Sequence, residues 1–437
     1  MSDMNIAVEG SAASNASSRG NTKADLVWML GLYGTAIGAG VLFLPINAGV
    51  GGLWPLVAMA ILALPLTFFA HRGLTRFVLS GSTRDGDITE VVEEHFGKTA
   101  GKFITLLYFF AIYPIVLMYS VAITNTVESL LVHQLGMTAP PRAVLSLALI
   151  LGLMAVVRLG GQFIVKAMSV LVFPFVLTLM GLAFYLVPHW NGAIITEAPA
   201  LSDAFNGDFI KTLWLAIPVM VFSFNHSPII SSFAVDNKGR YGAGAEKKCG
   251  NILLGAHVMM VMMVMMVMTV MFFVFSCVLS LSPADLAAAK EQTITILSYL
   301  ANHFDNAFIA TAAPLIAMVA ISKSFLGHYL GAKEGMNGLM AKALREKGKQ
   351  VDIKQLDKVT AVFMILTTWA VATVNPSILG MIEDLGGPII AMLLFLMPMY
   401  AITKVPAMRK YAGNISNGFV TLIGLIAMSG IIYKLIA

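Results

Sequence analysis

Polar and titratable side chains gather in one short stretch of an otherwise apolar part of the chain. The string "FSFNHSPII" (222–230) brings together Ser223, Asn225, His226 and Ser227. Hydroxyl and amide groups hydrogen-bond small polar ligands, and an imidazole titrates near neutral pH. The stretch therefore predicts a ligand site. For any single serine the alternative is a hydrogen bond to its own helix, and for His226 it is a neutral, hydrogen-bonded imidazole.

A lone lysine, Lys323, lies inside a long apolar segment. It precedes Lys333, at the expected inner end of that segment, by ten residues, or about 15 Å of helix. An ionisable residue at that depth in a membrane is a functional hypothesis by default. We expect Lys323 to couple a proton to the function of the ligand site, with His226 as the rival proton carrier. A static structural pair is the alternative for Lys323.

Glycines interrupt a second apolar stretch, "GTAIGAG" (34–40). Glycine is among the poorest helix formers, and without Cβ it lets a ligand approach the backbone. A break in a membrane helix exposes N–H and C=O groups, which can bind the carboxylate and ammonium of an amino acid. We expect backbone contacts to such a ligand at Thr35, Ala36, Gly38 and Gly40. A small-residue packing face of the GxxxG type is the alternative.

The elements that must position these residues are membrane helices. Hydrophobic residues make up 58% of the 437 residues and charged residues only 12%, against about 25% in soluble proteins. Residues 1–25 are polar and lack a signal-peptide core, so we expect a disordered cytoplasmic tail. We expect eleven spans: 26–48, 53–74, 101–132, 142–157, 163–187, 210–235, 251–282, 307–333, 359–375, 378–402 and 415–433.

The basic residues predict the orientation of these spans. With the N-terminus inside, Lys323 lies within a span, and the only other Lys or Arg outside the inner loops are Arg142, Lys211, Lys290 and Lys434. Cytoplasmic loops carry the Lys and Arg excess, so we expect a cytoplasmic N-terminus and a periplasmic C-terminus. The positive charge needs no nucleic-acid partner.

Two segments between spans are expected to be helices that do not cross the membrane. Residues 85–97 form an amphipathic helix on the inner face, and residues 282–304 lie over the outer mouth, opening with a cap at Ser282.

Tyr113, Tyr119 and Asn125 on the third span are expected to face the ligand cavity. Glu383 and Asp384, at the start of the tenth span, could form an outer gate or accept a proton. A solvated loop end is the alternative for both acids.

Several strings resemble the hydroxy/aromatic amino acid permease family of the amino acid–polyamine–organocation superfamily. They are "GTAIGAGVLFLP", "FSFNHSPIISSF", "TITILSYLANHF", "KSFLGHYLGAKEG" and "NPSILGMIEDLGGPIIAM". The resemblance runs from about residue 23 to the C-terminus. It implies an all-α, LeuT-type fold with broken helices 1 and 6. The ten-helix core would span 26–412, with inverted five-helix repeats at 26–189 and 208–402, and 413–437 would add one helix.

The resemblance also implies a function. It implies a secondary transporter of a bacterial inner membrane that imports L-serine by proton symport through alternating access. The alternatives are a threonine or aromatic amino acid/proton symporter and a serine-binding membrane sensor. A membrane enzyme is disfavoured, because no catalytic set or metal-spaced His/Cys cluster is found in the sequence. We expect no cofactor other than the coupling proton, no metal, and no obligate protein partner.

Overall fold

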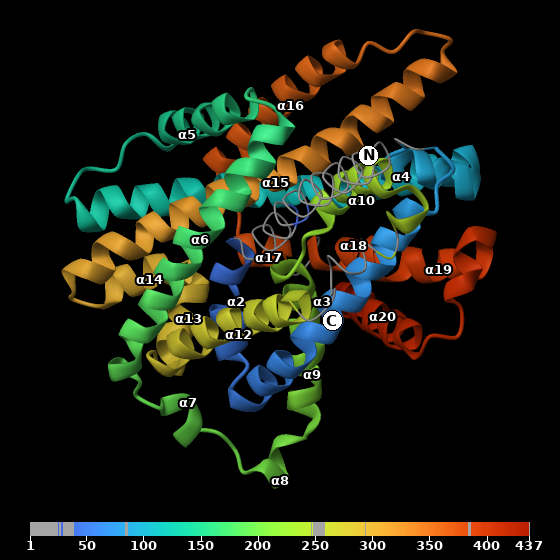
Figure 1. Ribbon diagram of the computed structural model, residues 1–437. Coiled ribbons are helices and arrows are strands. Elements are labelled where there is room, and N and C mark those ends of the chain that lie inside the picture. The colour runs from blue at the N-terminus through green and yellow to red at the C-terminus, as the bar shows by residue number, and fades with distance from the viewer. Residues whose placement is uncertain are drawn as a thin grey trace, which may run out of the picture.

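The computed structural model describes residues 25, 28, 39–83, 86–245, 247, 258–292, 294–382 and 386–436. In these ranges the chain is helical and contains no strand (Figure 1). Thr35, Ala36, Gly38, Glu383 and Asp384 lie outside the described residues, as do residues 1–24 of the expected tail.

The first half of the chain opens with a discontinuous element. The 3₁₀ turn η1 (Ala39–Leu42) is followed by the short helix α2 (Leu44–Val50). Gly52, with φ 86°, turns the chain into the next helix. The remaining elements of this half are α3 (Leu53–Leu79), α4 (Ile88–Ser129), the π-helical turn η2 (Leu130–Gln134), α5 (Arg142–Val157), α6 (Gly161–Leu186), η3 (Val187–His189), α7 (Ala193–Thr196) and α8 (Leu201–Ala204).

The second half repeats this discontinuity and is completed by longer helices. Its first helix is split into α9 (Gly207–Ser223) and α10 (Ser227–Tyr241), which is followed by η4 (Gly242–Gly244). The rest comprises α12 (Val258–Leu279), α13 (Pro283–Glu291), α14 (Ile296–His303), α15 (Ala307–Glu346), α16 (Ile353–Val374), α17 (Ile378–Met381), α18 (Gly387–Ala391), η6 (Met392–Leu396), α19 (Met397–Lys404), η7 (Pro406–Tyr411) and α20 (Ile415–Ile436).

The predicted surface helices are present, with one correction. Gly97, with φ 80°, kinks α4 where the inner-face helix was expected to end. The prediction of a single helix at residues 282–304 is wrong. It forms α13 and α14, because Thr295 caps a new helix by accepting a hydrogen bond from the Ser298 N–H. Helix α13 turns away from α12 by 106° and packs against α2, while α14 packs against α15.

Five of the described helices are long and apolar enough to cross a bilayer: Leu53–Leu79, Ile88–Gln134, Ala307–Glu346, Ile353–Val374 and Gly387–Lys404. Other apolar helices, such as Arg142–Val157, are shorter. The total of eleven spans, the two inverted repeats and the division of the chain into tail, core and additional helix stay predictions.

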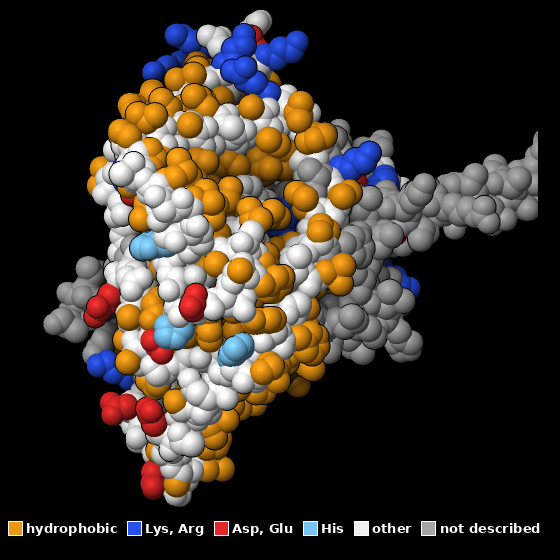
Figure 2. Space-filling model, turned by 90° about the vertical axis from the view of Figure 1, so that its left-hand side faces the viewer, with side chains coloured by type: hydrophobic (Ala, Val, Ile, Leu, Met, Phe, Trp, Pro, Cys, Tyr) orange, Lys and Arg blue, Asp and Glu red, His pale blue; other side chains and the backbone are white. Residues whose placement is uncertain are grey.

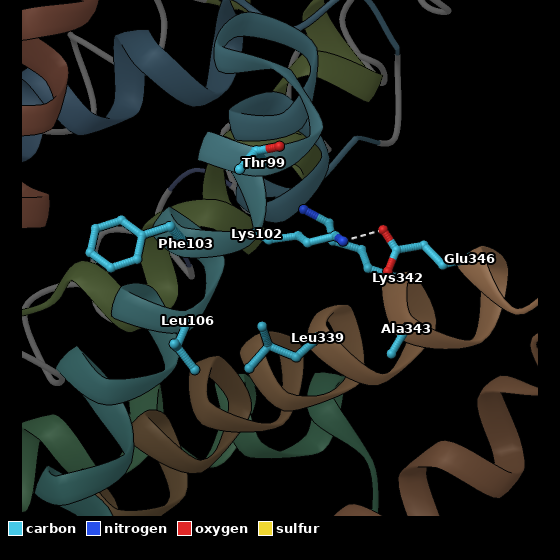
Figure 3. Close-up of a pocket in the computed structure, with 8 residues that line it drawn as sticks. All are labelled: Thr99, Lys102, Phe103, Leu106, Leu339, Lys342, Ala343 and Glu346. Carbon is cyan, nitrogen blue, oxygen red and sulfur yellow. Dashed lines mark ion pairs between the residues drawn. The ribbon is translucent and has the colours of Figure 1, made fainter.

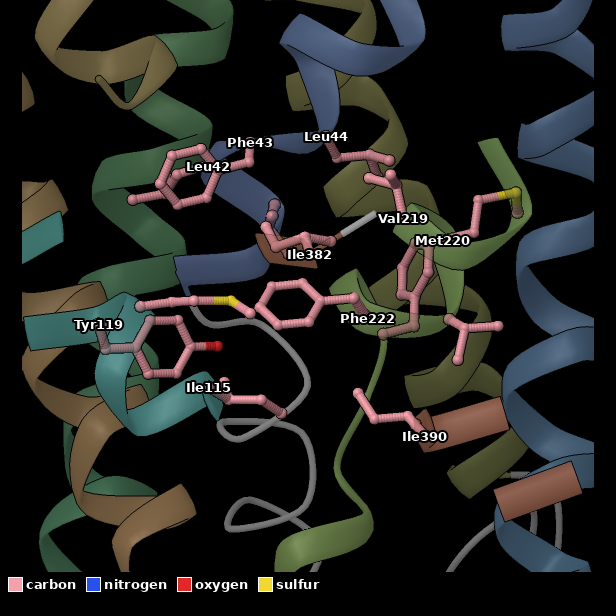
Figure 4. Close-up of a cluster of buried hydrophobic side chains, with 14 of the residues drawn as sticks. Leu42, Phe43, Leu44, Ile115, Tyr119, Val219, Met220, Phe222, Ile382 and Ile390 are labelled. Atoms are coloured by element: carbon pink, nitrogen blue, oxygen red, sulfur yellow. The ribbon is translucent and has the colours of Figure 1, made fainter. Parts of the chain in front are cut away.

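The helices pack so that the two discontinuous elements are enclosed by long helices. Helix α15 runs along α4 and also contacts α6 and η1, whereas α9 contacts α3, α18 and α20 (Figure 1). Apolar side chains from η1, α2, α4, α9 and the tenth predicted span meet between them (Figure 4). This packing buries the ends of the broken helices in the core.

Candidate functional site

The sixth predicted span is broken where the sequence indicates. Helix α9 ends at Ser223 and α10 begins at Ser227, with Pro228 in its first turn. Ser223, Asn225, His226 and Ser227 are all buried. The structure therefore brings the predicted polar residues together at an interrupted helix inside the protein.

The backbone donors at this break are paired in unusual ways. The N–H of Phe224 donates to the Met220 carbonyl at 3.1 Å, as in a helix, but the N–H of Asn225 donates to Phe222, only three residues back, also at 3.1 Å. The N–H of Ser227 donates to Oδ1 of the Asn225 side chain at 3.0 Å. Among the described residues, Nδ2 of Asn225 and Nε2 of His226 are buried without a hydrogen-bond partner. Buried polar groups are normally paired, so these two atoms are suited to a ligand.

The two broken elements touch at Gly40. Its carbonyl accepts a hydrogen bond from the Ser223 hydroxyl at 3.2 Å. A Cβ on Gly40 would lie 2.9 Å from the Cα of Ser223, closer than real Cβ contacts allow. The sequence analysis assigned Ser223 to the ligand. In this arrangement its hydroxyl instead donates its proton to the other broken element.

Tyr119 on α4 connects these breaks to α15. Its hydroxyl is hydrogen-bonded to the backbone of Gly40 and to the side chain of Ser324. Its ring faces that of Phe222 (Figure 4), at 6.4 Å between the centroids. It also lies edge-on to His328 at 5.3 Å. Tyr119 thus lies beside the breaks, and its contact with a ligand stays a prediction.

Lys323 is buried on α15, next to Ser324 in the chain. Only 1% of its surface is exposed, and its Nζ lies 4.4 Å from the centroid of the Phe175 ring on α6. An aromatic face attracts an ammonium, and the attraction is stronger where water is excluded. Lys323 thus lies on the helix that packs against both η1 and α6.

Two predicted neighbours of the site point elsewhere. The Tyr113 hydroxyl donates to Thr367 on α16, and its ring stacks on Phe109 at 4.7 Å. Oδ1 of Asn125 accepts from Arg142 on α5 at 2.6 Å, so the expectation that Asn125 faces the ligand cavity is wrong. The two side chains instead join α4 to α16 and to α5.

A polar network below the break was missed. Trp28 Nε1 donates to Asp236 at 2.6 Å, the Tyr241 hydroxyl donates to Asp25 at 2.8 Å, and Arg240 forms an ion pair with Asp236. It ties the described residues of the N-terminal segment to α10. This polar end of the helix was visible in the sequence. Asp236, Arg240 and Tyr241 lie at the end of α10, after its apolar part has ended.

Two grooves in the described part of the chain lie away from the break. One, of about 350 Å³ between α4 and α15, has Phe103, Leu106 and Leu339 along its floor and the ion pair of Lys102 with Glu346 at its rim (Figure 3). The other, of about 730 Å³, lies between α5, α15 and α16. Neither groove is lined by the buried residues of the helix breaks, so neither is the candidate ligand site.

Comparison with known proteins decides the family. The family model of the tryptophan/tyrosine permeases matches residues 25–434. The chain belongs to the tryptophan/tyrosine permease family. Membership confirms the resemblance to amino acid permeases and makes the chain a multi-pass membrane permease rather than an enzyme.

Similar permeases are known from enterobacteria. The serine transporter SdaC of Escherichia coli (strain K12) is 70% identical over 414 residues, which are 94% of this chain and 95% of that protein. The threonine/serine transporter TdcC of Escherichia fergusonii is 48% identical over 429 residues, covering 94% of this permease and 96% of the relative.

Solved structures of other transporters share the fold of this permease. The crystal structure of MhsT in complex with L-phenylalanine gives a TM-score of 0.58 at 16% identity, covering 94% of this chain and 98% of that one. A manganese transporter from Eremococcus coleocola gives a TM-score of 0.61 at 10% identity, covering 94% and 86%. This likeness supports the LeuT-type helical architecture, and at such low identity it carries no information on the substrate.

Proposed function

We propose that this permease imports L-serine together with protons across a bacterial inner membrane. The observation that carries the proposal is the 70% identity to a serine transporter over 94% of the chain. The buried polar side chains at the break between α9 and α10 supply groups that suit a hydroxyl-bearing amino acid. The coupling ion is the proton, and no cofactor or metal takes part.

The substrate binds between the two broken helices. Its charged ends contact backbone groups of the first break, at Thr35, Ala36, Gly38 and Gly40, while its side chain meets Asn225 and Ser227. The Ser223 hydroxyl takes part as an acceptor only, because its own proton goes to the Gly40 carbonyl. Unpaired backbone groups at a membrane break cost several kcal/mol each, so a bound amino acid stabilises the break by pairing them. Tyr119 holds Gly40 from the side. Tyr113 has no direct contact with serine, because its hydroxyl is bonded to Thr367.

Transport follows alternating access. One half of the bundle rocks against the other around the breaks, so that the site opens first to the periplasm and then to the cytoplasm. Glu383 and Asp384 act at the outer gate. The ion pairs of Arg240 with Asp25 and Asp236 form part of the inner gate in this proposal.

Lys323 is the proton carrier, with His226 as the competing candidate. Its ammonium supplies a positive charge on α15, the helix that packs against η1. Loss of the proton removes this charge, so the two protonation states favour different arrangements of the helices.

Uptake into proteoliposomes tests the function. With an inward proton gradient, labelled L-serine should accumulate, and without the gradient it should only equilibrate. Binding without accumulation would indicate the sensor alternative, and a requirement for sodium would contradict proton coupling. Excess unlabelled threonine, tryptophan or tyrosine tests the substrate range. The 48% identity to a threonine/serine transporter favours threonine among these as a second substrate.

The variant Lys323→Met tests the coupling role. It keeps an unbranched apolar stem of similar length and cannot bind a proton. We expect serine binding to remain measurable while proton-driven accumulation is lost, and counterflow of serine at equal pH to persist. Normal accumulation in Lys323→Met would assign the proton to His226 or to the acids at the outer gate.

A further inference from the structure

Two buried histidines from distant parts of the chain stack face to face at the break. His71 lies on α3 and His226 directly precedes α10. Their ring centroids are 3.5 Å apart, and the planes differ by 8°. Each residue is only 2% exposed. The sequence analysis gave His71 no role.

Two backbone partners of His71 determine where its proton lies, and the Asn225 side chain is a third hydrogen-bonding neighbour. Nδ1 of His71 is 2.7 Å from the Thr67 carbonyl, which can only accept a hydrogen bond. Nε2 of His71 is 3.1 Å from the backbone N–H of His226, which can only donate. His71 is therefore the neutral tautomer with the proton on Nδ1. A second proton, on Nε2, would point at the His226 N–H and break this bond.

This bond differs from the others at the break. The N–H groups of Phe224, Asn225 and Ser227 are all paired within residues 220–227. Among the described residues of the break, only the N–H of His226 is paired by a side chain from another helix. In a regular helix it would donate to the carbonyl of Phe222, four residues back. His71 thus accepts a hydrogen bond from the His226 N–H, which has lost its helical acceptor at the break.

The same contact determines how His226 presents its ring. Nδ1 of His226 is 3.2 Å from the Phe224 carbonyl, so this nitrogen carries a proton. Stacking on His71 fixes the plane of the ring. Nε2 of His226 then remains as a buried atom without a partner among the described residues.

We propose that His71 is a positioning residue that holds the break between α9 and α10 in its unwound form. It does so by accepting the His226 N–H at Nε2 and by stacking on the His226 ring. It touches no substrate itself. Its effect on serine affinity rests on the proposed function, whereas its effect on the backbone of the break does not.

Two variants separate the acceptor from the aromatic ring. His71→Phe keeps a ring that can stack and removes the acceptor. His71→Gln places an amide oxygen near the position of Nε2 and removes the ring. His71→Asn is the matched control for polarity, because its shorter side chain brings the oxygen closer to the position of Nδ1 and leaves the His226 N–H without an acceptor.

Hydrogen exchange of residues 222–231 without substrate is the first measurement. A buried donor that loses its partner destabilises its surroundings, and we expect exchange in His71→Phe to rise roughly ten-fold or more. His71→Gln should stay within about three-fold of the wild type. His328→Phe is the control for loss of a buried imidazole. The one hydrogen bond described for His328 goes to the Ser324 carbonyl of its own helix, and a phenyl ring can keep the edge-on contact with Tyr119, so exchange at the break should stay unchanged.

Serine uptake is the second measurement. We expect KM to rise roughly ten-fold in His71→Phe and to recover in His71→Gln. A merely structural role would lower the amount of folded transporter, and with it the maximal rate, without changing KM. Wild-type exchange and KM in His71→Phe would overturn the proposal. If His71→Phe does not fold, equal behaviour of His71→Gln and His71→Asn would overturn it. Absence of serine uptake by the wild type would contradict the proposed function and leave the exchange result as the test of His71.

Discussion

Gly40 is a residue at which η1 meets the end of α9. A methyl group at this position would lie 2.9 Å from the Cα of Ser223. Backbone cannot yield as a flexible side chain can, so the broken helices would have to move apart. We expect Gly40→Ala to lower serine uptake at least ten-fold and to cost about 1–3 kcal/mol of stability. Uptake kinetics and thermal unfolding in detergent measure both effects.

A matched glycine provides the control. Gly152 lies inside α5, and a Cβ there would meet no atom within 4 Å. Alanine is a better helix former, so Gly152→Ala should leave uptake unchanged and should not destabilise the protein. Wild-type uptake by Gly40→Ala would mean that the contact between Gly40 and Ser223 is not maintained during transport.

At the residue scale, the sequence predicted groups that are close in the chain and missed those that meet only in space. The polar stretch before Pro228 needed no tertiary information. Tyr113 and Tyr119 are six residues apart, which at about 100° per residue places them on different faces of α4. Helical geometry therefore already argued against a shared cavity. His71 could not have been found, because its partner His226 is 155 residues away in the chain.

At the element scale, the predicted helix ends are right where the local composition sets the end of the helix. They are wrong where packing against another helix extends it. Helix α5 has the predicted bounds, Arg142–Val157. Helix α15 was expected to end near Lys333 but continues to Glu346. The added turns are polar, yet they pack against α4, and Lys342 donates to the Thr89 carbonyl at 2.8 Å and to the Thr105 hydroxyl at 2.9 Å. No local sequence pattern predicts such hydrogen bonds between residues far apart in the chain.

The start of α13 gives a prediction for one element. Ser282 and Asp285 form a reciprocal capping box, and Tyr299 of α14 donates to Asp285 at 3.1 Å. Burial alone would raise the pKa of Asp285, but the hydrogen bonds from Ser282 and Tyr299 hold it below its ordinary value. The stabilisation by the ionised carboxylate is therefore complete above a pH of about 4, and it is lost as the pH falls through the lowered pKa.

The variant Asp285→Asn removes the charge and keeps an acceptor. We expect it to be less stable than the wild type by about 1 kcal/mol at pH 6, and the difference to be smaller at pH 3. Thermal unfolding in detergent at the two pH values measures this difference. A gap that is equally large at both pH values would show that the charge of Asp285 does not stabilise the cap.

At the scale of the whole molecule, the face shown in Figure 2 separates most of its basic side chains from its acidic ones. On the face in Figure 2, Lys and Arg side chains gather at one end, Asp and Glu lie toward the other, and apolar side chains form a broad band between them. A bilayer accommodates such a band, and the basic end belongs on the cytoplasmic side. The distribution agrees with the orientation predicted from the loops, in which the connection between α15 and α16 is inside.

Cysteine labelling tests this orientation on the intact protein. In a background with Cys249→Ser and Cys277→Ser, which removes both cysteines of the chain, we introduce Lys349→Cys between α15 and α16 or Glu197→Cys after α7. Both positions are exposed, so a difference in labelling reflects the side of the membrane. A membrane-impermeant maleimide should label Glu197→Cys in intact spheroplasts and Lys349→Cys only after permeabilisation, with serine uptake confirming that each variant is folded. The reverse pattern would place the basic end outside.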